Sequence, residues 1–424
     1  MKHRYHIIPF ALALLAIVPG LYVRGAHLCL TPQLTALLAG LAILGASFLL
    51  LWACEAAQQD ISQSLALAVV ALVAVAPEYM VDMYFTWQAG RHPESNYAHY
   101  AVANMTGANR LLIGVAWAAI AVIFWFKTRQ SVRIDTERRT ELFFLGLATV
   151  YAFVLPIKGS LAWYDGVVLL GLYVWYMTLS ARRPVAEFEA EGPAELLAEL
   201  PVLPRRLATA GAFLVALVAV VFNAGPFSEG LVATGKAWHI NEFLLVQWLA
   251  PIASEAPEFL VAIMFALRRQ AGLALGSLLS AKLNQWSLLV GMIPLVYALA
   301  FGGLTPPMPL SGFQMEEVLL TAAQSLLAVV LLASLQLSLA SGVLLFVLFF
   351  GQLVTPQLVA ALPGGTLLGV QADHMHYVFS VLYGIAVLPV LVRNWPAILR
   401  LRWGLRIETC SDTRPQMGAP EKTD

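Results

Sequence analysis

Two glutamates inside apolar stretches carry the chemistry expected of this chain. Glu78 and Glu258 each end an Ala-Pro-Glu phrase within a long apolar run. A carboxylate at that depth in a membrane is costly, so such residues usually face a bundle interior or a wet cavity and mark an ion or proton pathway. The proline beside each glutamate frees a backbone carbonyl, which is tolerated where it lines a cavity or is buried in protein. The repeated phrase therefore predicts a cation site between two related halves.

The composition is that of a helical, polytopic membrane protein. The 424 residues are 60% hydrophobic and 12% charged, whereas a soluble domain has about 25% charged residues. The formal net charge is zero, so the expected surroundings are a lipid bilayer and no nucleic-acid partner is indicated. The three cysteines show no disulfide or metal spacing. Because no metalloprotease or serine-hydrolase motif lies in a span, we expect neither an enzyme nor a cofactor.

Twelve stretches approach the length of about 20 apolar residues that a spanning helix needs. The loops after the fourth, sixth and eighth spans and the C-terminal tail are rich in arginine, whereas loops 302–315 and 356–375 have no lysine or arginine. The positive-inside rule then places both termini in the cytoplasm, here of a bacterial inner membrane. We interpret the first span as an uncleaved helix rather than a signal peptide. The expected spans are 6–24, 33–55, 62–88, 98–126, 141–156, 160–180, 206–223, 241–267, 271–301, 316–334, 337–355 and 376–392.

The two Ala-Pro-Glu phrases belong to an internal repeat. The helix with Glu78 is third in the predicted order and the helix with Glu258 is eighth, so the two cross the membrane in opposite directions, as in an inverted-topology repeat. Ser62 and Asn241 are predicted N-caps of these helices. A segment rich in small residues follows each glutamate, at 101–109 and at 271–281.

These phrases resemble the membrane region of the sodium/calcium exchangers, in the cation/calcium exchanger superfamily. That family has two inverted repeats, each with Gly-Thr-Ser-x-Pro-Glu on one helix and Gly-Asn-x-x-Gly-Ser-Asn-x-x-Asn/Asp on the next. The resemblance covers about 33–355. It implies an all-α fold with a ten-helix core of two inverted five-helix repeats and one extra helix at each end. It also implies that Glu78 and Glu258 are the central metal ligands, for calcium, a hard cation that prefers oxygen.

The chain departs from the family phrases at several positions. The Thr-Ser pair is Ala74-Val75 in the first repeat and Ser254-Glu255 in the second, so hydroxyl ligands are lost and a carboxylate is gained. The resemblance extends the ion-binding set beyond the two central glutamates to Glu255, Ser254, Asn109 and Gln285.

Two further charged residues stand near the predicted site. Lys282 occupies a position where the family has asparagine, and an ammonium inside a membrane must pair or lose its proton. If Lys282 faces Glu255 and Glu258, which share one helix face, it acts as a counter-ion or proton-linked partner. A purely structural salt bridge and snorkelling to an interface are the alternatives. Asp82, one turn after Glu78, is either a titrating partner or a solvated residue near the outer mouth.

The sequence divides into six expected parts. The linker near the midpoint is acidic and the tail is polar, so both are expected outside the membrane. His374 and His376, just before the last span, are expected at the interface rather than in a metal site. The parts are an N-terminal extra helix at 1–32, a first inverted repeat at 33–180, a charged cytoplasmic linker at 181–205, a second inverted repeat at 206–355, a C-terminal extra helix at 356–403 and a disordered tail at 404–424.

The predicted function is secondary active cation antiport by alternating access. Calcium for sodium is what the resemblance implies, while exchange of sodium or calcium for protons fits the lost hydroxyls and Lys282. The alternative is a non-transporting sensor or assembly protein on a decayed exchanger scaffold, for which Glu78→Gln and Glu258→Gln would leave activity intact. The ions, their stoichiometry and the oligomeric state stay open.

Overall fold

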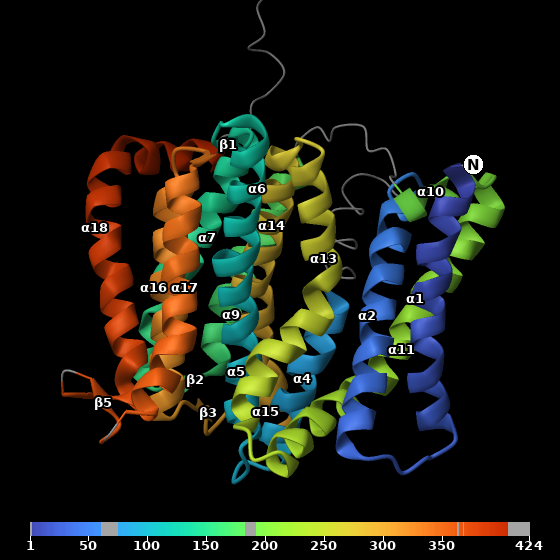
Figure 1. Ribbon diagram of the computed structural model, residues 1–424, viewed down its shortest axis with the longest axis horizontal. Helices are drawn as coiled ribbons and strands as arrows, with labels where there is room; N and C mark the ends of the chain where they lie inside the picture. Colours follow the sequence, from blue (N-terminus) through green and yellow to red (C-terminus); the bar gives the residue numbers. More distant parts are fainter. Residues whose placement is uncertain (1, 61–74, 183–191, 363, 368, 406–424) are drawn as a thin grey trace, which may run out of the picture.

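The computed structural model describes residues 2–60, 75–182, 192–362, 364–367 and 369–405. Ten helices in this part of the chain are long and apolar enough to cross a membrane. They stand side by side as an all-α bundle, and the first helix begins at the same end at which the last described helix finishes (Figure 1). We call this the terminal end and the opposite one the distal end.

Nearly all secondary structure in both halves is helical. The first half contains α1 (Lys2–Gly25), α2 (Pro32–Ala57), α4 (Ala76–Arg91), α5 (Tyr97–Leu111), η1 (Leu112–Trp117), α6 (Ala118–Thr128), η2 (Thr136–Arg138), α7 (Arg139–Ala152), α8 (Val154–Lys158) and α9 (Trp163–Ser180). After the linker follow η3 (Gly192–Ala194), α10 (Glu195–Ala198), α11 (Val202–Ala237), α12 (Glu242–Leu244), η4 (Leu245–Leu249), α13 (Ala250–Leu267), α14 (Ala271–Asn284), η5 (Gln285–Leu289), α15 (Val290–Phe301), α16 (Gly312–Leu332), α17 (Leu339–Ala360), η6 (Ala372–His374), α18 (Met375–Leu401) and η7 (Arg402–Leu405).

The predicted spans correspond to these helices, with corrections. The span predicted at 206–223 is wrong in length, because α11 has 36 residues and also takes up the end of the predicted linker. It continues past the apolar run because its polar side chains have partners: Asn223 donates to Ala219 O at 2.8 Å, and Glu229 accepts from Tyr84 at 2.9 Å. The last span is also longer than predicted, since α18 continues to Leu401.

Parts of three predictions lie outside the described residues. These are the start of the third span with its Ser62 cap, the acidic part of the linker and nearly all of the tail. The other predicted cap is confirmed, because Asn241 Oδ1 accepts from the N–H of Phe243 at 3.0 Å.

The two halves run in opposite directions and are joined at both ends of the bundle. The chain in α4 runs toward the distal end and that in α13 toward the terminal end, which confirms the inverted repeat (Figure 1). Two short antiparallel ladders each join the first half to the second: β1 (Val132–Arg133) with β4 (Gln336–Leu337), and β2 (Ser160–Leu161) with β3 (Met308–Pro309). A third ladder, β5 (Thr366–Leu367) with β6 (Val370–Gln371), precedes α18.

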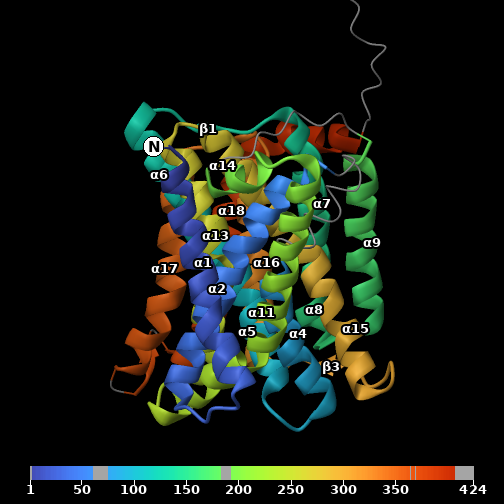
Figure 2. The same ribbon diagram turned by 90° about the vertical axis from the view of Figure 1, so that its right-hand side faces the viewer.

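Helices α1, α2 and α11 form a layer of their own along one side (Figures 1 and 2). At the terminal end, Arg205 before the apolar part of α11 binds Asp60 after α2 through two bonds of 2.6 and 2.9 Å. Arg206 adds a third bond of 3.0 Å. These hydrogen bonds, chiefly those from Arg205, lower the pKa of Asp60 to about 2. The extra first helix, α1, packs on α2 and α11 within this layer, and the extra last helix packs on α16 and α17 at the opposite edge.

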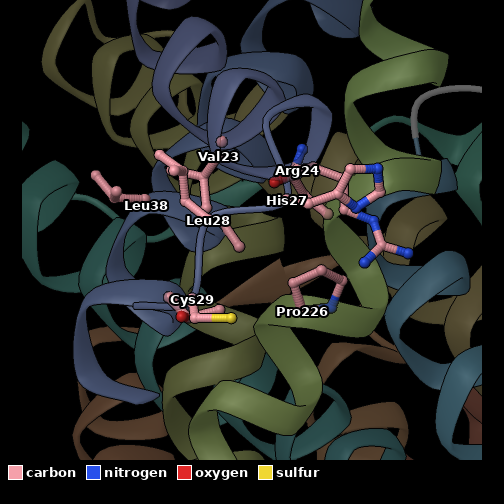
Figure 3. A pocket seen from close by; sticks show the side chains of 11 residues that line it. Val23, Arg24, His27, Leu28, Cys29, Leu38 and Pro226 are labelled. Atoms are coloured by element: carbon pink, nitrogen blue, oxygen red, sulfur yellow. The ribbon is translucent and has the colours of Figure 1, made fainter. Parts of the chain in front are cut away.

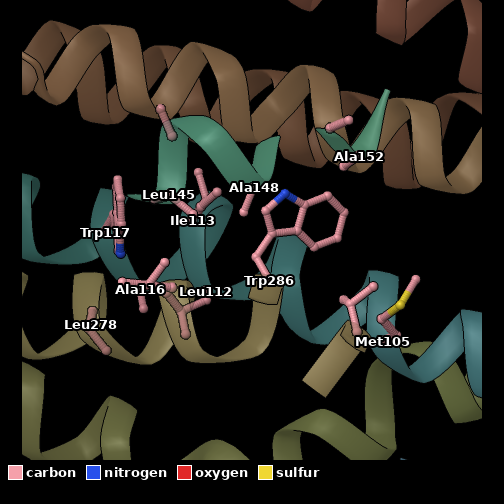
Figure 4. Packing of buried hydrophobic residues seen from close by; sticks show 14 of the residues in the cluster. Met105, Leu112, Ile113, Ala116, Trp117, Leu145, Ala148, Ala152, Leu278 and Trp286 are labelled. Carbon is pink, nitrogen blue, oxygen red and sulfur yellow. The ribbon is translucent and has the colours of Figure 1, made fainter. Parts of the chain in front are cut away.

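The packed core between the halves holds the motif helices close together. Trp286 and Trp117 are buried among small and aliphatic side chains of α5, η1, α7 and α14 (Figure 4). A Cβ at Gly107 would lie 1.9 Å from the backbone oxygen of Gln247, so only glycine permits this crossing of α5 and η4. The π-helical segments η1 and η5 occupy matching places in the two halves, and such segments frequently mark functional sites.

Candidate cation site

The carboxyl groups are positioned by proline-containing helix segments. Glu78 lies in the first turn of α4, directly after Pro77. Glu255 and Glu258 flank Pro257 inside α13. The missing N–H of that proline frees a carbonyl one turn earlier, as expected of a helix segment that lines a cavity.

A small cavity lies where α4, η1, α13, α14 and η5 meet. Its volume is about 10 Å³, which is roughly the space for one water molecule or one bare cation. It brings together five of the predicted ion-binding residues, and these come from both halves. The lining residues are Val75, Glu78, Leu112, Ser254, Glu255, Glu258, Ala281 and Gln285.

Gln285 links the carboxyl groups of the two halves. Its amide Nε2 donates to Glu78 Oε2 at 3.0 Å and to Glu255 Oε1 at 2.9 Å. Among the described residues, the remaining oxygens Glu78 Oε1, Glu255 Oε2 and Gln285 Oε1 have no hydrogen-bond partner, and the same holds for Glu258 Oε2. Ser254 donates to backbone carbonyls of its own helix and lines the cavity. The cavity is thus a concentration of oxygen acceptors.

The chemistry of such a donor set is the binding of cations or protons. Glu78 is 2% exposed and Glu255 is 3% exposed, so their charges are poorly screened. Three carboxyl groups in one dry cavity cannot all stay ionised without positive charge. Within the described residues they are not gathered into a ready-made metal cluster, so a bound cation would have to draw them together.

Lys282 and Asn109 pair with each other rather than with the cavity. The fully buried Lys282 Nζ donates to Asn109 Oδ1 at 2.6 Å and Asn109 O at 3.3 Å, and lies 4.5 Å from the centre of the Trp286 ring. Among described residues, no carboxylate forms an ion pair with Lys282. The salt-bridge and snorkelling interpretations are therefore wrong, and the oxygen predicted as an ion ligand at Asn109 is occupied.

Asp82 is buried next to the cavity, so its predicted placement in a solvated mouth is wrong. The side chain is 0% exposed, and neither carboxyl oxygen has a hydrogen-bond partner in the described structure. It lies one turn beyond Glu78 toward the distal end of α4. The neighbouring Asn104 is 1% exposed, and among the described residues its Oδ1 also has no hydrogen-bond partner.

A second buried polar group was not predicted from the sequence. Glu317 Oε2 accepts from Arg110, from Gln247 at 2.7 Å and from Thr106 at 3.3 Å. Its other oxygen lies 3.1 Å from His376 Nδ1. We call these five residues the Glu317 cluster. The sequence signal is a glutamate at the start of the span predicted at 316–334, and Glu317 is not among the predicted site residues.

A larger cavity lies apart from all predicted site residues. Its volume is about 400 Å³, and it opens between α1, α2 and α11 near the distal end (Figure 3). Arg24, His27 and Cys29 line it together with aliphatic side chains. Since it lacks a carboxylate, it does not provide the ligands of a cation site.

Comparisons with known proteins agree with the geometry. A family model described as sodium/calcium exchanger protein matches residues 32–182 and 208–356. An uncharacterised membrane protein of Methanocaldococcus jannaschii is 22% identical over 255 residues, which are 59% of this chain and 74% of the relative.

Solved structures extend the similarity over nearly the whole chain. The crystal structure of an H+/Ca2+ exchanger superposes with a TM-score of 0.87 at 40% identity, covering 94% of this chain and 97% of that one. A sodium-calcium exchanger superposes with a TM-score of 0.51 at 19% identity, covering 76% of this chain and 98% of the other, which supports the fold alone.

Proposed function

Because this chain belongs to the sodium/calcium exchanger family, we propose that it exchanges calcium for protons across a membrane. Family membership makes it a cation exchanger; the ions and the mechanism are our proposal. The calcium ligands would be Glu78, Glu255, Glu258, Ser254 and Gln285. The observation that carries the proposal is that one small cavity joins these oxygen-bearing side chains from both halves.

The charge of the cavity favours a divalent cation. Calcium takes six to eight oxygen ligands from carboxylates, amides and water. Glu78, Glu255 and Glu258 supply three carboxyl groups, and one oxygen of each has no hydrogen-bond partner in the part of the chain that the structure describes. Carbonyl and hydroxyl oxygens of Gln285 and Ser254 complete the set.

Protons are the proposed counter-ion because the cavity lacks what sodium would need. The hydroxyl pair of the family phrase is Ala74-Val75 in the first half, so neutral oxygens for a second metal ion are missing there. When calcium leaves, its charge is replaced by protons on the buried carboxyl groups. Lys282 would act on the site through its charge, and Asp82 would hold a proton in its dry position. The 40% identical solved relative is described as an H+/Ca2+ exchanger, which supports this choice.

Alternating access would come from movement of α2 and α11 against the rest of the bundle. These helices pack on each other, and Asp60 with Arg205 ties them at the terminal end. We place the protein in a bacterial inner membrane with the terminal end in the cytoplasm, and we retain the divisions at 1–32, 33–180, 181–205, 206–355, 356–403 and 404–424.

The experiment is calcium-45 uptake into proteoliposomes with an imposed proton or sodium gradient. We expect the proton gradient to drive uptake and the sodium gradient to have no effect, and Glu78→Gln and Glu258→Gln to abolish uptake. Glu94→Gln is the matched control, since Glu94 is exposed in a loop outside the cavity. Uptake driven by sodium and indifferent to pH would refute proton exchange. No flux with either gradient, or full activity of both cavity variants, would favour the non-transporting alternative.

A further inference from the structure

The Glu317 cluster is a second buried ionic centre, separate from the proposed calcium cavity. Glu317 is 0% exposed and Arg110 is 1% exposed. Three donors occupy one carboxylate oxygen, while the other, Oε1, has only the His376 ring nearby. That pair is within ion-pair distance at 3.1 Å but is not aligned as a hydrogen bond. One oxygen of Glu317, Oε2, therefore accepts three hydrogen bonds, whereas the contact of Oε1 with His376 can change with the protonation of the histidine.

The cluster connects four helical segments, including one that carries the cation site. Glu317 lies on α16, Arg110 and Thr106 on α5, and His376 at the start of α18. Gln247 belongs to η4, which continues without a break into α13 and thus into Ser254 and Glu258. Release of Gln247 from Glu317 would free this helix near the distal end.

The charges in the cluster balance only while His376 is neutral. Arg110 is permanently positive and Glu317 supplies one negative charge. Tyr383 of α18 is a neutral neighbour of Arg110, and α17 contains no charged residue. A proton on His376 would leave one uncompensated positive charge in a dry place, which is strongly unfavourable unless the side chains reach water.

The histidine lies near the distal end of the bundle and is partly exposed. His376 begins α18 at the distal end, and its side chain is 13% exposed. His374, two residues earlier, is 57% exposed and lies 3.0 Å from Glu316. The distal aqueous phase therefore reaches His376 without passing through the calcium cavity.

We propose that His376 and Glu317 form a proton-binding site that opens the distal side of the protein. Protonation from the distal phase adds a second cation beside Arg110, weakens the closed cluster and releases Gln247 with the helix that carries the cation ligands. Acid on the distal side therefore accelerates exchange. This mechanism rests on the proposed exchange function, but the proton site itself does not.

Thermal unfolding of the purified protein tests the site independently of transport. Wild type, His376→Gln and His374→Gln are compared from about pH 8 to 5.5, the range in which histidine changes charge. We expect the melting temperatures of wild type and His374→Gln to fall by the same amount on acidification. The melting temperature of His376→Gln should fall less, because glutamine cannot take up the proton. An equal loss in all three proteins would refute the site, whatever the transport activity.

Calcium-45 exchange at equal calcium on both sides of oriented membrane vesicles tests the consequence. The pH is lowered on the distal side alone. Because variant and wild type have the same cavity carboxyl groups, the effect of pH on these groups cancels when the exchange rate of the variant is divided by that of wild type. We expect His376→Gln to match wild type at about pH 8 and to be slower by about fivefold or more at pH 5.5, the lower range of a coupling between two sites. His374→Gln should follow wild type throughout. A ratio for His376→Gln that does not change with pH would refute coupling.

Discussion

Replacement of Gln285 by leucine should raise the pH that calcium binding requires. The amide nitrogen of Gln285 bridges Glu78 and Glu255 at 3.0 and 2.9 Å. An amide N–H stabilises a carboxylate more than a carboxylic acid, so the bridge favours the ionised pair. Without it, protons compete better with calcium for the same oxygens. Half-maximal calcium binding should therefore move to higher pH.

The size of this shift follows from the geometry of the bridge. A hydrogen bond to a charged group contributes about 1.5–3 kcal/mol. Because a single amide nitrogen donates to both carboxyl groups, we use the contribution of one hydrogen bond to a charged group. One pH unit corresponds to about 1.4 kcal/mol, so the midpoint should rise by about one to two pH units.

The assay is equilibrium binding of calcium-45 to purified protein over a range of pH. Gln352→Leu is the matched control, because Gln352 is also buried in a helix at 1% exposure but its amide has no hydrogen-bond partner in the described structure and does not line the cavity. This control should keep the wild-type midpoint. A Gln285→Leu midpoint within about 0.3 units of wild type, well under one such bond, would refute the reasoning.

Four further single variants test other parts of the structure. Arg110→Met and Glu317→Gln each leave the other member of this buried ion pair without its charged partner. Each should therefore lower the free energy of unfolding by about 3–5 kcal/mol. In denaturant unfolding, the double variant should be destabilised by less than the sum of the two single variants. Lys282→Met tests the charge that we propose for this side chain. Removal of that charge should tighten calcium binding about tenfold, a modest Coulomb effect; weaker binding by calorimetry would contradict this. Arg205 holds the pKa of Asp60 at about 2, below the unfolded value of about 3.9. Asp60 therefore stabilises the fold above that value, so the melting-temperature difference between Asp60→Asn and wild type should be present at about pH 5 and vanish toward pH 2.

The cation site was predictable from the sequence because its signal is topological. The helices of Glu78 and Glu258 are five places apart in the order of spans, with four spans between them, which makes the two helices antiparallel. Small residues let their neighbours approach. The position of Gln285 followed from the phrase on the next helix. These residues meet in one cavity because the repeat fixes which helices cross, and spacing alone carries that information.

The partners of isolated buried charges were not predictable in the same way. Lys282 and Gln285 are three residues apart on one helical surface, yet the amine binds Asn109 while the amide binds the carboxylates. Which partner each side chain binds depends on how closely α5 packs against the helix of Lys282 and Gln285. The content of small residues does not specify that distance. Glu317 was missed for a related reason, because its charge becomes meaningful only beside Arg110 from the other half.

The order in which the chain is synthesised makes these pairings matter for biogenesis. Arg110 enters the membrane 207 residues before Glu317, its only ion-pair partner in the described part of the chain. At about 5–20 residues per second, roughly 10–40 s of translation separate them. During that time the first half exposes an unpaired guanidinium, an unpaired Asp82 and two ladder strands without partners. The nascent first half should therefore be held by the insertion machinery, and its final packing must wait for the second half to arrive.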